Sequence, residues 1–143
     1  MVPEMTVPYE DIEKLIRVYS GTKKTLMPET RIVEDLGIYG DDFFELIESY
    51  AETFNVNMDG FLWYFHTREE GSLNPGALIF KTPDRRVRRI PVTIAMLKGY
   101  ADNGKWGTDY PEHKIPEERW DVIITWVFFT IPILIMIIAA FLK

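Results

Sequence analysis

Side chains with metal-binding or catalytic chemistry are few in this sequence. His66 and His113 are the only histidines, and there is no cysteine, which excludes disulfide bonds, thiolate metal ligands and a cysteine nucleophile. His113 and Glu117 have the i, i+4 spacing of two ligands on a helix face, but Pro116 lies between them and no further ligands stand out. We therefore expect no metal site and no cofactor, and we interpret His66 as a partly buried ring.

The patterns of the common catalytic motifs are also missing from the chain. It has no glycine-rich phosphate loop and no serine in a nucleophile-elbow pattern. Carboxylates are plentiful, but nothing in their spacing singles out an acid/base pair. We predict that the protein is not an enzyme.

Acidic side chains gather where a second helix is expected to begin. The residues concerned are Asp35, Asp41, Asp42, Glu45, Glu48 and Glu52. An exposed acidic surface attracts a basic patch on a partner protein, through steering that weakens as the salt concentration rises. An ordinary solvated helix face has the same composition, so the sequence leaves both interpretations open.

Four arginines lie within five positions, namely Arg85, Arg86, Arg88 and Arg89. One interpretation is a solvated or ion-paired edge strand with Val87 facing inward. A second is contact with anionic lipid headgroups, worth about 1 kcal/mol per charge near a membrane surface. A third is pairing with the acids of the second helix, within one chain or between two chains.

Composition limits the partners of the 143-residue chain. It carries 16 basic and 22 acidic residues, a formal net charge of −6. A domain that binds phosphate backbones is normally basic, so nucleic acid is not expected as a main partner. Residues 1–107 are long enough for one small domain, the head, and residues 108–121 form a polar linker with Pro111 and Pro116.

Apolar periodicity predicts three helices in the head. The first covers residues 8–19, with one apolar face formed by Tyr9, Ile12, Leu15, Ile16 and Tyr19. The second starts after Asp42 as N-cap, with Glu45 in capping-box spacing, and ends near Asn55; its apolar face is Phe43, Leu46, Ile47, Tyr50, Ala51 and Phe54. The third covers residues 91–102 and turns Ile94, Leu97, Tyr100 and Ala101 inward. Residues 77–81 and 87–90 are predicted as two short strands of a β-hairpin.

Residues 122–142 predict a membrane-spanning helix. The run VIITWVFFTIPILIMIIAAFL has no charged residue, and at about 1.5 Å per residue it spans roughly 30 Å, the thickness of the hydrocarbon core of a bilayer. Trp120 and Trp126 lie near its entry, where indole rings favour the interface. The alternative is a buried core helix, but Pro132 would cost a soluble helix about 3 kcal/mol.

Basic residues near the span predict its orientation. Lys105, Lys114 and Arg119 precede it, and Lys143 alone follows it, which favours a cytoplasmic head. We expect a tail-anchored, single-pass protein of the bacterial inner membrane that inserts after synthesis.

The segment RIVEDLGIYGDDFFELIESYAETF, residues 31–54, resembles the signature of acyl carrier proteins. The matching positions are Glu34, Asp35, Leu36 and Gly37 of the lead-in, Glu45 and Leu46 in the helix, and Phe54 at its aromatic end. The resemblance implies a mainly α, acyl-carrier-protein-like helical bundle. The serine that carries phosphopantetheine in that family falls on Gly40, so we expect no prosthetic group.

Residues 8–107 resemble more closely a family of small bacterial proteins that look like acyl carrier proteins and have no assigned function. The DLGIxGDD version of the motif and the ending Gly104-Lys105-Trp106 carry this resemblance. The long C-terminal span is an addition to it.

These observations predict a non-enzymatic, membrane-tethered adaptor that docks a protein partner through the acidic start of the second helix. One alternative is a regulatory or immunity-type subunit of a membrane complex, engaged through the span, with Pro132, Thr125 and Thr130 against a partner helix. A second alternative is an atypical acyl carrier modified at another residue. The sequence identifies neither the partner nor the oligomeric state.

Overall fold

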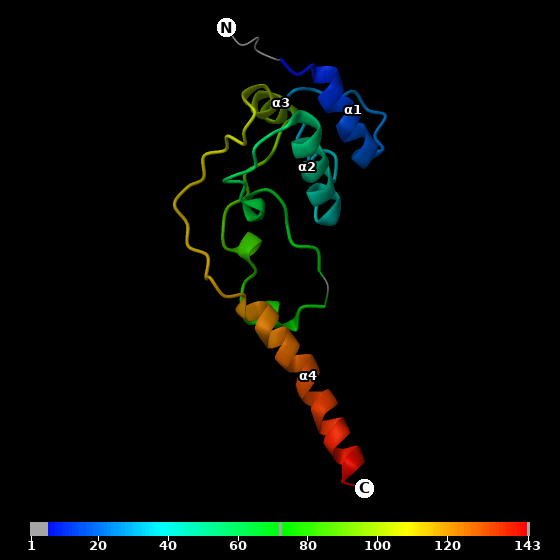
Figure 1. Cartoon of the computed structure of the whole chain (residues 1–143), viewed down its shortest axis with the longest axis vertical. Helices are drawn as coiled ribbons and strands as arrows, with labels where there is room; N and C mark the ends of the chain where they lie inside the picture. The colour runs from blue at the N-terminus through cyan, green and yellow to red at the C-terminus, as the bar shows by residue number, and fades with distance from the viewer. Residues whose placement is uncertain (1–5, 72, 143) are drawn as a thin grey trace.

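The chain is mainly helical, with a bundle at one end and a single long helix at the other (Figure 1). The computed structural model describes residues 6–71 and 73–142. Its elements in chain order are α1 (Tyr9–Ser20), α2 (Asp41–Phe54), the 3-10 turns η1 (Trp63–Phe65), η2 (Pro75–Leu78) and η3 (Pro83–Arg85), α3 (Ile94–Asn103) and α4 (Trp120–Phe141). α1 packs against α2 and α3, and η2 packs against α4.

The predicted helices are confirmed, with small shifts at their ends. Gly21 ends α1 in the left-handed conformation, φ 60°, as expected of a C-terminal glycine. α3 begins at Ile94, three residues later than predicted, because the Thr93 side chain caps it by accepting a hydrogen bond from the Met96 amide at 3.2 Å.

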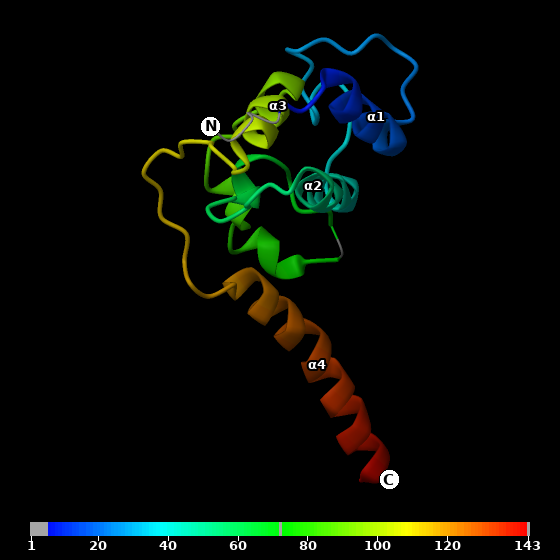
Figure 2. The same cartoon turned by 45° about the horizontal axis from the view of Figure 1, so that its top comes forward.

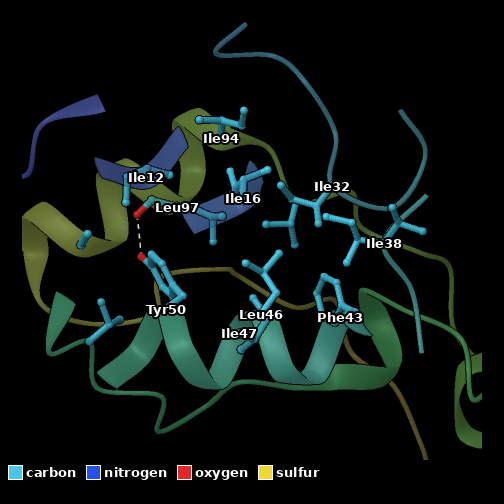
Figure 3. Close-up of a cluster of buried hydrophobic side chains, with 14 of the residues drawn as sticks. Ile12, Ile16, Ile32, Ile38, Phe43, Leu46, Ile47, Tyr50, Ile94 and Leu97 are labelled. Carbon is cyan, nitrogen blue, oxygen red and sulfur yellow. Dashed lines mark hydrogen bonds between the residues drawn. The ribbon is translucent and has the colours of Figure 1, made fainter. Parts of the chain in front are cut away.

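The bundle core is formed by the predicted apolar faces (Figure 3). The fully buried side chains include Ile12 and Ile16 from α1, Phe43, Leu46 and Tyr50 from α2, and Ile94 and Leu97 from α3. Ile32 and Ile38, from the loop before α2, join this core, as do Leu26, Val33, Val56, Val92 and Trp106 from the other connecting segments. The Tyr50 hydroxyl donates a hydrogen bond of 2.5 Å to the Leu97 carbonyl, which ties α2 to α3, and burial raises the pKa of Tyr50.

The prediction that Asp42 caps α2 is wrong. The N-cap is Gly40, at φ 60° and ψ −132°, and both Asp41 and Asp42 lie in the first helical turn. As a glycine, the cap has no side chain that could accept a hydrogen bond from the first turn of the helix. Its own amide donates to Thr67 Oγ1 at 3.0 Å. Glycine at 40 allows the chain to turn into the helix two residues earlier than predicted, since a positive φ costs glycine no steric strain.

The predicted β-hairpin is also wrong. Residues 77–81 and 87–90 form no strand; they belong to a segment built on η2 and η3. Asn74 Oδ1 accepts from the Ala77 amide at 3.2 Å and starts η2. Pro75 and Pro83 each open a 3-10 turn, and proline cannot donate to a strand ladder. The only bridges within the described residues are isolated, Arg31 with Thr93 and Asn57 with Lys105.

Residues 104–119 connect α3 to α4 without a helix or strand, and they pass along the outside of the molecule (Figures 1 and 2). This connector is polar, as predicted, but it is attached to the head through Tyr110. Trp120 and Asp121, which the prediction placed in the linker, are the first two residues of α4.

Candidate docking surface and root of the C-terminal helix

The acidic side chains at the start of α2 point away from the bundle. Asp41, Asp42, Glu45 and Glu48 are all exposed, whereas Phe43, Leu46 and Ile47 between them are buried; Phe44 is exposed on the same side as the acids. Within the described residues, none of these four carboxylates forms an ion pair with a basic side chain. Asp41 and Asp42 also oppose the positive end of the helix dipole. We call these four residues the acidic surface.

Asp35 differs from the acidic surface, although the sequence grouped it with the other acids. Its carboxylate accepts two hydrogen bonds from the Arg31 guanidinium, at 2.6 and 3.0 Å, and one from the Arg31 amide at 2.8 Å. The Arg31 side chain lowers the pKa of Asp35 to about 2. Since its charge is already paired within the chain, Asp35 is less available to a partner.

A second segment of the chain closes over Gly40, where the sequence resemblance would place a carrier serine. The Asp41 amide donates to Glu70 Oε2 at 3.4 Å, beside the bond from Gly40 to Thr67. A Cβ atom at Gly40 would collide with the side chain of Glu70. Residues 67–70 therefore leave no room for a side chain at position 40.

The four arginines do not form an edge strand. All four are exposed, and Arg85 ends η3. Arg86 Nε donates to the Lys81 carbonyl at 2.9 Å. Arg86 lines a small cavity with Trp120 and Asp121, and Arg85 lines another with Glu69 and Asn74, so these two lie close to the start of α4. Arg88 and Arg89 line neither cavity.

A cluster of polar contacts that was not predicted from the sequence holds the start of α4. Asp121 is 2% exposed and accepts from Asn74 Nδ2 at 3.0 Å. One turn later, Thr125 Oγ1 donates to Asn74 Oδ1 at 2.5 Å and accepts from the Gly76 amide at 3.0 Å. We call Asn74, Gly76, Asp121 and Thr125 the root socket. Its sequence signals were the Asn-Pro-Gly turn and an Asp/Thr pair at i, i+4 spacing on the entering helix.

Arg119 links the root socket to the rest of the head. Its guanidinium donates to both oxygens of Asp121, at 2.9 and 2.6 Å, and to Glu69 Oε2 at 2.8 Å. These hydrogen bonds to two carboxylates raise the pKa of Arg119 further above its ordinary value. Glu69 precedes Glu70, whose side chain reaches the start of α2, so one short segment contacts both α2 and α4.

His66 is fully buried, more deeply than the expected partly buried ring. Its Nδ1 lies 2.9 Å from the Ile90 carbonyl, and its Nε2 lies 2.7 Å from the Tyr110 hydroxyl of the connector. Desolvation lowers the pKa of His66, against the effect of the bond to Ile90. Tyr110 also accepts from Trp106 Nε1 at 2.9 Å, so the connector is bound to the core through hydrogen-bonded rings.

Neither histidine belongs to a metal-ligand cluster. His113 Nε2 lies 2.9 Å from the Tyr64 hydroxyl, and its Nδ1 lies 2.8 Å from the Pro111 carbonyl. Over residues 6–71 and 73–142, no group of three His, Asp or Glu side chains is arranged to hold a metal ion.

α4 is long and apolar enough to cross a membrane. Beyond its first turns its apolar side chains, from Trp126 to Leu142, face outward and are not covered by the described part of the head. Thr130 Oγ1 donates to the Trp126 carbonyl at 2.8 Å, so its hydroxyl has a partner within the helix. Lys143, used in the charge comparison, lies outside the described residues.

Comparison with known proteins identified one family. The family model described as "Protein of unknown function (DUF1493)" matches residues 6–109, which cover the whole bundle and the start of the connector. No curated protein and no solved structure matches the chain.

Proposed function

Because the chain belongs to the DUF1493 family, whose description assigns no function, we propose one from its own residues. The protein is a non-enzymatic adaptor that α4 tethers to a membrane and that docks a partner protein through the acidic surface at the start of α2. The observation that carries the proposal is that Asp41, Asp42, Glu45 and Glu48 are exposed and unpaired within the described residues, next to a segment bound to α4. The partner would present a basic patch.

The anchoring part of the proposal is supported by the length and composition of α4 and by its uncovered apolar surface. In water this surface would be a large aggregation-prone patch. We place the protein in the bacterial inner membrane with its head in the cytoplasm, on the basis of the basic residues Lys105, Lys114 and Arg119 before the span.

The head is proposed to be a carrier-protein-like bundle that has lost its prosthetic group. Gly40 has no hydroxyl, and Glu70 fills the space beside it. The acidic surface would remain as the part of the carrier that meets partners, without the cargo arm.

Charge reversal on the acidic surface tests the docking proposal. Full-length protein carrying Asp41→Lys, Asp42→Lys and Glu45→Lys should recover no specific partner in a pull-down from solubilised membranes, because attraction to a basic patch becomes repulsion. Recovery of the wild-type partners by this variant would refute docking through α2.

A matched control changes the same number of charges elsewhere. Asp109→Lys, Glu112→Lys and Glu117→Lys alter three exposed acids of the connector, and partner recovery should be preserved. Because lysine in the first turn of α2 also opposes the helix dipole, at about 0.3–1 kcal/mol per residue, the milder set Asp41→Asn, Asp42→Asn and Glu45→Gln should be included. That set should weaken recovery while α2 stays folded.

A second candidate is a regulatory subunit of a membrane complex, engaged through α4. A shallow groove of about 380 Å³ lies beside Pro132, lined by Ile124, Val127, Phe128 and Ile131, and would accept a partner helix. Against it, Thr125 and Thr130 already have hydrogen-bond partners within the chain. Exchanging residues 127–142 for an unrelated span discriminates the two, since an adaptor should keep its partner and an intramembrane subunit should lose it.

A further inference from the structure

The segment around η2 exposes large apolar side chains next to the start of α4. Leu73 is 77%, Leu78 88% and Ile79 70% exposed. These values are unusual for leucine and isoleucine in a head whose other apolar side chains mostly fill one core. Their position beside the start of α4 indicates which surroundings would cover these side chains.

The root socket places η2 alongside the first turns of α4. The Gly76 amide bonds to Thr125, and the backbone of Gly76 approaches Asp121 so closely that a Cβ atom there would collide with the Asp121 carbonyl oxygen. Figures 1 and 2 both show the green η2 ribbon beside the orange start of α4. If α4 spans a bilayer from about residue 122, η2 lies at the depth of the headgroups and the upper acyl chains.

The side chains around this segment match the chemistry of that layer. Trp120, 48% exposed, packs near Phe80 with ring centroids 6.4 Å apart, and aromatic rings favour the interface. Arg85 and Arg86 are exposed beside the same root, where guanidinium groups would meet anionic headgroups. Exposed apolar side chains, aromatic rings and arginines thus occur together around η2 and the start of α4.

We propose that η2 is a second membrane contact: Leu73, Leu78 and Ile79 insert into the interfacial layer of an anionic bilayer, and Arg85 and Arg86 bind its headgroups. The proposal rests on the span proposed for α4 and goes beyond it, because it makes the head a monotopic domain lying on the lipid surface. Continuity with α4 and the adjacent cations argue for lipid as the occupant.

The absence of native cysteine makes a direct test simple. Full-length variants Leu78→Cys, Ile79→Cys, Ile137→Cys and Val18→Cys would each carry one NBD label, in vesicles of phosphatidylcholine with or without phosphatidylglycerol. Val18 is the matched control, since it is 77% exposed and apolar but lies on α1. We expect blue-shifted emission and quenching by shallow doxyl lipids at 78 and 79, deep quenching at 137, and quenching by aqueous iodide at 18.

The outcomes separate the two proposals. Lipid quenching at 137 with iodide quenching at 78 and 79 would refute the η2 contact and leave the span intact. No lipid quenching at 137 would overturn both. Labels at 78 and 79 that are shielded from lipid and iodide alike, with cross-links between chains, would show that a second copy covers η2 and would also refute lipid contact.

The arginines are tested in the same vesicles. Replacing Arg85 and Arg86 by glutamate should reduce the lipid quenching at position 78 in phosphatidylglycerol vesicles and change it little in pure phosphatidylcholine. The same replacement at Arg88 and Arg89 is the control and should have a smaller effect. Equal loss in both lipids would refute the headgroup contact.

Discussion

At the scale of single residues, Gly40 has no hydroxyl for a prosthetic group and no room for a side chain. Two constraints act there at once, the positive φ of its backbone and the side chain of Glu70. The sequence shows the missing hydroxyl but gives no sign of Glu70, which is thirty residues away and reaches the site only through the fold.

Placing a serine at this position should not create an attachment site for phosphopantetheine. Gly40→Ser is expected to lower the free energy of unfolding by about 1–2 kcal/mol, because a serine must adopt a conformation suited to glycine and displace Glu70. Intact-mass measurement after co-expression with a phosphopantetheinyl transferase should show no added mass.

Gly37→Ser is the matched control for this experiment. Gly37 also has a positive φ, 72°, but a Cβ there meets nothing within 4 Å. Gly37→Ser should therefore lower the free energy of unfolding by less than Gly40→Ser does. Adding Glu70→Ala should reduce the loss caused by Gly40→Ser and leave the loss caused by Gly37→Ser unchanged. A mass increase on the Gly40→Ser protein would contradict our reading of the site.

His66 should make the head sensitive to acid. Burial lowers the pKa of His66 below its ordinary value of 6.5, so in the folded protein the ring stays neutral at pH values where the unfolded chain takes up a proton. Stability is then complete above the unfolded pKa and falls as the pH drops through it, by at most about 1.4 kcal/mol per pH unit.

Urea unfolding of the full chain in nanodiscs, followed by tryptophan fluorescence between about pH 5 and 7, measures this dependence. His66→Gln should lose most of it, whereas His113→Gln should keep it because His113 lies on the exposed connector. A wild-type protein with constant stability over this range would show that His66 protonates in place.

At the scale of elements, the structure explains why η2 needs glycine at 76. Gly76→Ala would place a methyl group against the backbone of Asp121, which cannot move aside as a flexible side chain would. We expect η2 to separate from α4, at a cost of about 1–3 kcal/mol. Gly71→Ala, in the same segment with open space around it, should be neutral.

Electron paramagnetic resonance distances between labels at Val18→Cys and Ile131→Cys would report this change. The wild type and Gly71→Ala should give one narrow distribution, and Gly76→Ala a broad one. A narrow distribution for Gly76→Ala would mean that the socket does not hold the head.

The sequence predicted the helices of the head but not the conformation of the segment around η2. The helices were predictable because Ile12, Ile16, Leu46 and Leu97 repeat at helical spacing and are all buried. The hairpin was wrong because Leu78 and Ile79 looked like strand residues to be buried, whereas they are exposed next to α4.

The acidic surface could be read from the sequence as a group, but the pairing of Asp35 with Arg31 could not. The root socket was missed because Asn74 and Asp121 are far apart in the chain and each is polar, which favoured a loop and a linker. Contacts between segments so distant in sequence depend on the path of the whole chain, which local patterns do not encode.

At the scale of the whole molecule, the chain has an acidic head, two exposed arginines, Arg85 and Arg86, near the start of α4, and an apolar helix. If the head lies in the cytoplasm, a cysteine at Val18→Cys should be protected from a membrane-impermeant maleimide in spheroplasts and become labelled once the membrane is permeabilised. The expectation follows from the basic residues before the span. Labelling in intact spheroplasts would show that the head lies outside the cytoplasm and would contradict the proposed orientation.

The root socket also has a consequence for the way partners meet. If residues 108–121 were a flexible linker, their root-mean-square end-to-end distance would be about 20 Å, and the head would move over a similar distance relative to α4. If α4 spans a bilayer, the bonds made by Asn74 and Arg119 instead hold the start of α2 at one height and one tilt above it. A partner that docks on the acidic surface from the same membrane would then search in two dimensions and lose less rotational freedom on binding, so a weaker charge contact would be enough for association.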